Sequence, residues 1–128
     1  MSGARAAKLV LTAVLATSAL GIPIAGCGHT ATVGADRTLR LALTEYQVLP
    51  QKVQVSRGLV TIIVHNVGKL THNLVITEGA QRIDGTPPIW PGTTQQLLVT
   101  LSPGTYTMAS TLFSDQALGE YGTLTVTH

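Results

Sequence analysis

Apolar and polar residues alternate along most of the chain from residue 38 onward. A period of two predicts β-strands with one apolar face, and no window of eleven or more residues has the 3.6-residue period of an amphipathic helix. Residues 59–66 form the most β-branched run, which favours another strand. The alternating positions expected to face the core are Leu39, Leu41, Leu43, Val53, Val55, Leu97, Val99, Leu101, Leu124 and Val126.

Glycine and proline separate these runs, as at Arg57-Gly58, Pro91-Gly92 and Pro103-Gly104, and such residues favour turns. About seven short strands with this punctuation predict an all-β domain, either a sandwich or a barrel with Greek-key connections. Residues 78–84 lack a clear period, and we expect a single helical turn or an irregular loop there.

The first 27 residues have the pattern of a secretory signal. Arg5 and Lys8 precede an apolar run over residues 9–22, which is too short for a membrane span of about 20 residues. The following Ile24-Ala25-Gly26-Cys27 resembles a bacterial lipobox. We therefore expect a signal peptide over residues 1–26 and a lipid on Cys27, although an ordinary secretory signal with an incidental cysteine, or a buried free thiol, is the alternative.

Residues 27–37 are rich in Gly, Ala and Thr, and we expect them to form a lipidated, flexible tether ahead of a domain spanning residues 38–128. The diacylglyceryl group on Cys27 would hold this domain at the outer face of the cell membrane, and N-acylation of Cys27, which the sequence leaves open, would supply a second signal for stable anchoring. The protein is thus predicted to be a membrane-anchored, extracytoplasmic lipoprotein.

Charge and cysteine content exclude several classes of partner and site. After residue 26, six basic residues balance six acidic residues, so the chain has no excess of positive charge with which to neutralise phosphates, and nucleic-acid binding is disfavoured. Cys27 is the only cysteine, which excludes an internal disulfide framework and a CxxC-type metal or redox site.

Three further motifs occur in a characteristic order. His72-Asn73 follows a strand that ends at Asn66, the run from Leu101 to Tyr106 has the form of a tyrosine corner, and residues 119–126 read Gly-x-x-Gly-x-Leu-x-Val. Over residues 38–128 the sequence therefore resembles the cupredoxins, the small blue copper proteins of the plastocyanin and azurin kind. The resemblance implies an all-β, Greek-key β-sandwich of the cupredoxin type, with a copper site at one end.

The resemblance also implies a ligand set of His, Cys, His and Met, from which this chain departs. His72 matches the first ligand, but Ser110, Asp115 and Glu120 stand where the family has Cys, His and Met. A serine hydroxyl cannot replace a thiolate, and carboxylates are hard ligands with little affinity for Cu(I). We therefore expect no blue copper centre and no electron transfer, and strand parity predicts that the four residues still converge.

Three interpretations of this polar cluster remain open. The four side chains could satisfy one another by hydrogen bonds and ion pairs, or His72, Asp115 and Glu120 could bind zinc, manganese or a weakly held copper ion. Hydrolysis by Ser110, His72 and Asp115 is a third interpretation, but no sequence signature of an oxyanion hole or cleft accompanies it. No cofactor is expected under the first interpretation, and a copper or zinc ion under the second.

These observations predict a binding or accessory module of the cell envelope that is not an enzyme and does not bind nucleic acid. Its partners would be the membrane, through the lipid on Cys27, and an envelope protein that docks on the apolar segment 87–91 if that segment is exposed. We nevertheless expect Trp90 to cover the core. Met108 is expected in the core, and His65, by parity, in solvent.

Overall fold

A computed structural model of the chain describes residues 29–112 and 119–128. In these residues the chain forms ten β-strands and no α-helix, and none of them belongs to a helix long and apolar enough to cross a membrane. The predicted signal peptide, Cys27 and Asp115 lie outside the described residues.

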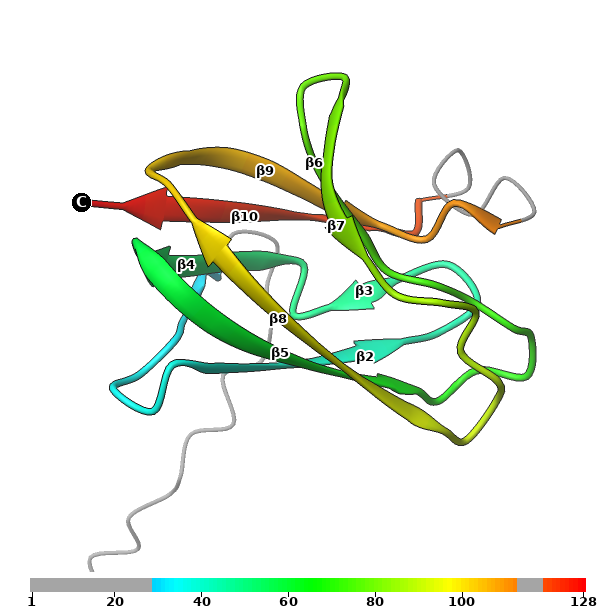
Figure 1. The fold of residues 1–128 in the computed structure, drawn as a ribbon. Helices are drawn as coiled ribbons and strands as arrows, with labels where there is room; N and C mark the ends of the chain where they lie inside the picture. Colours follow the sequence, from blue (N-terminus) through cyan, green and yellow to red (C-terminus); the bar gives the residue numbers. More distant parts are fainter. Residues whose placement is uncertain (1–28, 113–118) are drawn as a thin grey trace, which may run out of the picture.

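The strands form two sheets that pack face to face (Figure 1). The first sheet has the order β1 (Ala31–Thr32), β4 (Lys52–Ser56), β10 (Tyr121–Thr127), β9 (Gly104–Ala109), β6 (Val75–Glu78) and β7 (Gln81–Gly85). The second has the order β3 (Val48–Leu49), β2 (Thr38–Leu43), β5 (Gly58–Asn66) and β8 (Thr94–Leu101). The chain crosses repeatedly between the sheets, and the predicted all-β, Greek-key sandwich is confirmed.

The alternating residues occupy the space between the sheets as predicted. Every second residue of β5 is buried, and Val60, Ile62 and Val64 have no exposed surface. Parallel pairing of β2 with β5 places Leu39 opposite Ile62 and extends the same inward face. Each fully buried aliphatic side chain of this kind contributes roughly 1.5–3 kcal/mol, so the core holds the two sheets together. Met108 is also buried in this core, as expected.

The predicted tyrosine corner is present at the β8–β9 connection. The Tyr106 hydroxyl donates a hydrogen bond to the Ser102 carbonyl at 2.7 Å. Tyr106 pairs with Leu124 in the antiparallel β9–β10 ladder, and this ladder brings the end of β9 beside the start of β10. The corner therefore fixes the strand from which Ser110 emerges.

Two local predictions are corrected. Residues 31–32 lie in the expected tether but form β1, because their backbone pairs with β4 and the next residue, Val33, donates to the Gln54 carbonyl at 2.9 Å and packs against the core. Residues 78–84 form neither a helical turn nor an irregular loop. They belong to the β6–β7 hairpin, because Gly79, with φ of 57°, adopts the left-handed conformation that a tight turn requires.

Candidate functional site

The predicted cluster lies at one end of the sandwich, where β2, β5 and β9 end and β10 begins (Figure 1). His72 comes from the connection between β5 and β6. Its backbone pairs with Ile89, with His72 N donating to Ile89 O at 3.2 Å and Ile89 N to His72 O at 2.6 Å. The imidazole has no exposed surface. Backbone pairing thus places the ring inside the end of the sandwich.

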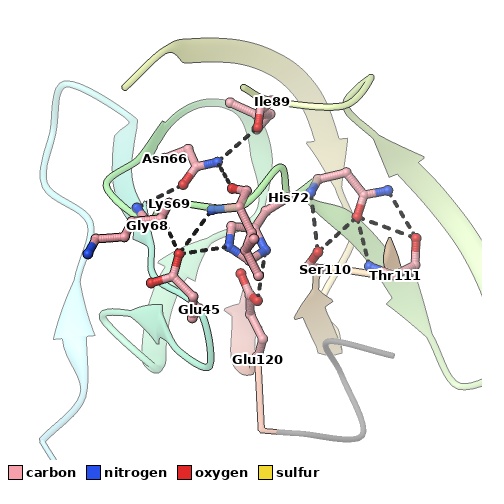
Figure 2. Close-up of polar contacts among 11 residues, drawn as sticks. Glu45, Asn66, Gly68, Lys69, His72, Ile89, Ser110, Thr111 and Glu120 are labelled. Carbon is pink, nitrogen blue, oxygen red and sulfur yellow. Dashed lines mark hydrogen bonds and ion pairs between the residues drawn. The ribbon is translucent and has the colours of Figure 1, made fainter. Parts of the chain in front are cut away.

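Asn66, the last residue of β5, shapes the loop that carries His72. Its side-chain amide donates to the carbonyls of Leu70 at 2.8 Å and Ile89 at 2.9 Å, and its oxygen accepts from Gly68 N at 2.9 Å (Figure 2). These bonds satisfy a fully buried amide. They also hold the loop in one position relative to the neighbouring 86–93 connection.

The two ring nitrogens of His72 face two different carboxylates (Figure 2). Nδ1 lies 3.1 Å from Glu120 Oε2, and both side chains are fully buried. Nε2 lies 3.9 Å from Glu45 Oε1, whose side chain is 31% exposed. A buried carboxylate is costly unless a partner compensates it, and His72 is such a partner for Glu120. The arrangement is a Glu45–His72–Glu120 chain of charged and polar groups.

Glu45 also binds the backbone of the His72 loop. Its Oε1 accepts hydrogen bonds from Lys69 N and from Leu70 N, the latter at 3.1 Å. These N–H groups favour the ionised carboxylate and lower the pKa of Glu45 from its ordinary value of 4.5. Sequence reasoning treated Glu45 only as a charge. It lies far from His72 along the chain in the β2–β3 turn, and no periodicity or motif marks it.

Ser110 is connected to the His72 loop by hydrogen bonds with Asn73. The Ser110 hydroxyl accepts from Asn73 N at 3.2 Å and donates to Asn73 Oδ1 at 3.2 Å. Thr111 N donates to the same Oδ1 at 2.7 Å, and Asn73 Nδ2 donates to Thr111 Oγ1 at 3.0 Å. Ser110 N also donates to the Glu120 carbonyl at 3.3 Å. The hydroxyl is thus part of a hydrogen-bond network that joins β9 to the His72 loop.

Of the four predicted residues, the structure brings together His72, Ser110 and Glu120, and Asp115 lies outside the described residues. Across residues 29–112 and 119–128, no group of three or more His, Cys, Asp or Glu side chains is arranged to hold a metal ion. His65 is exposed, as expected, and its Nδ1 lies 2.7 Å from Thr94 Oγ1.

The expectation that Trp90 covers the core is wrong. Its side chain is 67% exposed, whereas the preceding Ile89 is fully buried, because the bridge to His72 turns Ile89 inward and leaves Trp90 facing outward. Trp90 lines an open apolar groove of about 740 Å³ beside the site. The groove is formed by Lys69, Leu70, Thr71, Pro88, Trp90 and Leu112.

No protein-family model matches the chain, and no curated protein matches its sequence. Solved structures do match its fold. Reduced auracyanin from Roseiflexus castenholzii aligns with a TM-score of 0.66 and 22% identity, over 74% of this chain and all of that one. Rusticyanin from Thiobacillus ferrooxidans aligns with a TM-score of 0.60 and 18% identity, over 76% of this chain and 81% of that one. A purple cupredoxin from Nitrosopumilus maritimus aligns with a TM-score of 0.56 and 18% identity, over 70% of this chain and 99% of that one.

Proposed function

We propose that this chain, which has the cupredoxin fold, is a lipid-anchored binding module of the cell envelope that has lost the blue copper centre and carries no electrons. The observation that supports it is the position of His72 between two carboxylates, at 3.1 Å from Glu120 and 3.9 Å from Glu45. The groups next to the imidazole are thus carboxylates, which are hard ligands with little affinity for Cu(I).

The donor atoms do not fit a blue copper ion. Such an ion needs a thiolate and two imidazoles, with a weak thioether as a further ligand. At the position that the resemblance assigns to the thiolate, the Ser110 hydroxyl is hydrogen-bonded to Asn73. At the thioether position is the carboxylate of Glu120. The only cysteine in the chain is Cys27, the residue expected to carry the lipid.

The groove beside the site supports a binding role rather than catalysis. Trp90 and Leu70 are large apolar side chains in contact with water, and exposed apolar surface of this kind marks interaction sites. An envelope protein that covers the groove would gain about 25 cal/mol for each Å² of apolar surface removed from water. Ser110, the nucleophile in the hydrolytic interpretation, is bonded to Asn73, which favours a structural role for its hydroxyl.

Visible absorption tests the proposal. The full chain, purified from membranes, is titrated with Cu(II), with His72→Ala as the matched variant and a known blue copper protein measured alongside. We expect no intense thiolate-to-copper band in either form of this chain. A strong blue band in the wild type that His72→Ala abolishes would overturn the proposal.

The second candidate is a divalent metal site that uses His72 with Asp115 and Glu120. It is favoured by one observation, the approach of an imidazole and a carboxylate to 3.1 Å in a buried position, because Zn(II) accepts both kinds of donor. Isothermal titration with Zn(II), Mn(II) and Cu(II) distinguishes it from the first proposal. Heat of binding that is lost in His72→Ala supports the metal site, and no heat with any of the three ions removes it.

A further inference from the structure

The first strand determines where the chain enters the domain. β1 runs parallel to β4, with Ala31 opposite Val53. The start of β1 therefore lies at the same end as the start of β4, near Gln51 and Lys52. Cys27 precedes Ala31 by four residues, and a fully extended chain of that length spans about 14 Å. A flexible tether that extended to residue 37 would span more than twice that distance.

Several exposed side chains suited to a membrane surface surround this entry point. Tyr121, at the start of β10, is 44% exposed, and Leu49, at the end of β3, is 42% exposed. Both are near the entry point, because Thr123 N donates to the Gln51 carbonyl at 2.7 Å and Leu49 is two residues before Gln51. Tyr46, 55% exposed, is also nearby, because its backbone carbonyl lies 3.5 Å from where a side chain at Gly119, two residues before Tyr121, would begin.

We propose that Tyr46, Leu49, Lys52 and Tyr121, here called the entry surface, contact the phospholipid bilayer in which the protein is anchored. This inference rests on the proposed lipid on Cys27. The short connection holds the entry surface close to the bilayer. Tyrosine rings are amphipathic and enriched at membrane–water interfaces, and the exposed Lys52 ammonium is attracted to anionic headgroups.

The opposite edge of the sandwich points away from the bilayer in this orientation. β3 and β8 are the two edges of the second sheet, with β2 and β5 between them. Leu98 on β8 is 54% exposed and therefore matches Tyr46 in exposure but not in position. The groove is lined in part by Lys69 and Leu70, whose backbone N–H groups donate to Glu45 in the β2–β3 turn, so it lies near the Tyr46 end of the entry surface.

Fluorescence quenching in vesicles tests the orientation. Trp90 is the only tryptophan, so a Trp90→Phe background has none. Three variants are made in this background, each with one tryptophan as a fluorescent reporter: Leu49→Trp, Tyr121→Trp and the control Leu98→Trp. The full lipidated chain is reconstituted in vesicles of phosphatidylcholine and phosphatidylglycerol that carry a quencher high on the acyl chains. Circular dichroism verifies that each variant is folded.

We expect quenching and a blue-shifted emission for the reporters at 49 and 121, and neither change at 98. Equal quenching at all three positions, or quenching only at 98, overturns the inference while leaving the lipid anchor intact. A chain that fails to co-float with the vesicles instead contradicts the proposed anchor, and the inference fails with it. Cleaving the lipid-bearing segment after reconstitution should release the protein, because the entry surface is too small to retain it alone.

Discussion

The buried contact between His72 and Glu120 predicts a large stability effect for a very small substitution. Glu120→Gln keeps the size of the side chain and removes its charge, so it opens no cavity. Both side chains are fully buried and 3.1 Å apart, and a buried polar group that loses its partner costs about 1–3 kcal/mol, or more when the group is charged. We take about 3 kcal/mol as the expected loss, roughly a hundredfold in the folding equilibrium.

Urea unfolding followed by circular dichroism measures this loss. With a slope of about 1–1.5 kcal/mol per molar urea for a domain of this size, the midpoint should fall by about 2–3 M. Glu45→Gln is the matched control, because it makes the same change at the other ring nitrogen of His72, where the carboxylate is partly exposed and its oxygen still accepts backbone hydrogen bonds. Its midpoint should move less.

A double-mutant cycle separates the pair from other effects of the substitution. His72→Gln combined with Glu120→Gln removes both members, so the double variant should lose less stability than the sum of the two single variants. Additive losses, or a Glu120→Gln midpoint equal to that of the wild type, would refute the view that the two side chains stabilise each other.

Three other substitutions test separate parts of the fold. Tyr106→Phe removes the hydrogen bond of the tyrosine corner and should cost about 1 kcal/mol in urea unfolding; an unchanged midpoint would contradict this. The folded-state pKa of Glu45 is lowered below 4.5, so its carboxylate stabilises the fold above that pH and the contribution is lost as the pH falls through the lowered pKa. As the pH is lowered, the wild type should therefore lose more free energy of unfolding than Glu45→Gln. Equal losses in the two proteins would contradict the stabilising role of the Glu45 carboxylate. Gly122→Ala would place Cβ 2.7 Å from the Gln51 carbonyl and should cost about 1–3 kcal/mol in thermal unfolding, whereas Gly34→Ala, whose nearest neighbour is at 3.9 Å, should not.

Strand parity accounts for the part of the site that could be anticipated. Asn66 has the same parity along its strand as Val64 and Ile62, and Ser110 has the same parity as Met108 and Tyr106. Alternation alone therefore directs both polar side chains inward. His72 lies in the connection between β5 and β6, where its backbone bridge to Ile89 holds it. Convergence of His72, Ser110 and Glu120 was thus predictable, whereas the prediction for Asp115 concerns a residue outside the described ranges.

The sequence by itself determined which residues of the longer alternating strands, β2, β4, β5, β8, β9 and β10, are buried. Alternation of Leu39, Leu41 and Leu43 specifies an inward face whatever the neighbouring strand is, and the corner at Tyr106 is formed within five residues. These features are local, because the period of the backbone and the geometry of turns require no distant partner.

Only the tertiary structure decided how distant segments meet. The approach of Glu45 to His72, the pairing of β1 with β4 and the outward position of Trp90 all depend on backbone pairings between segments that are separate in sequence. A charged residue in a turn carries no period, and a two-residue strand is too short to show one. Such residues acquire their role when closure of the sandwich brings their partners within reach.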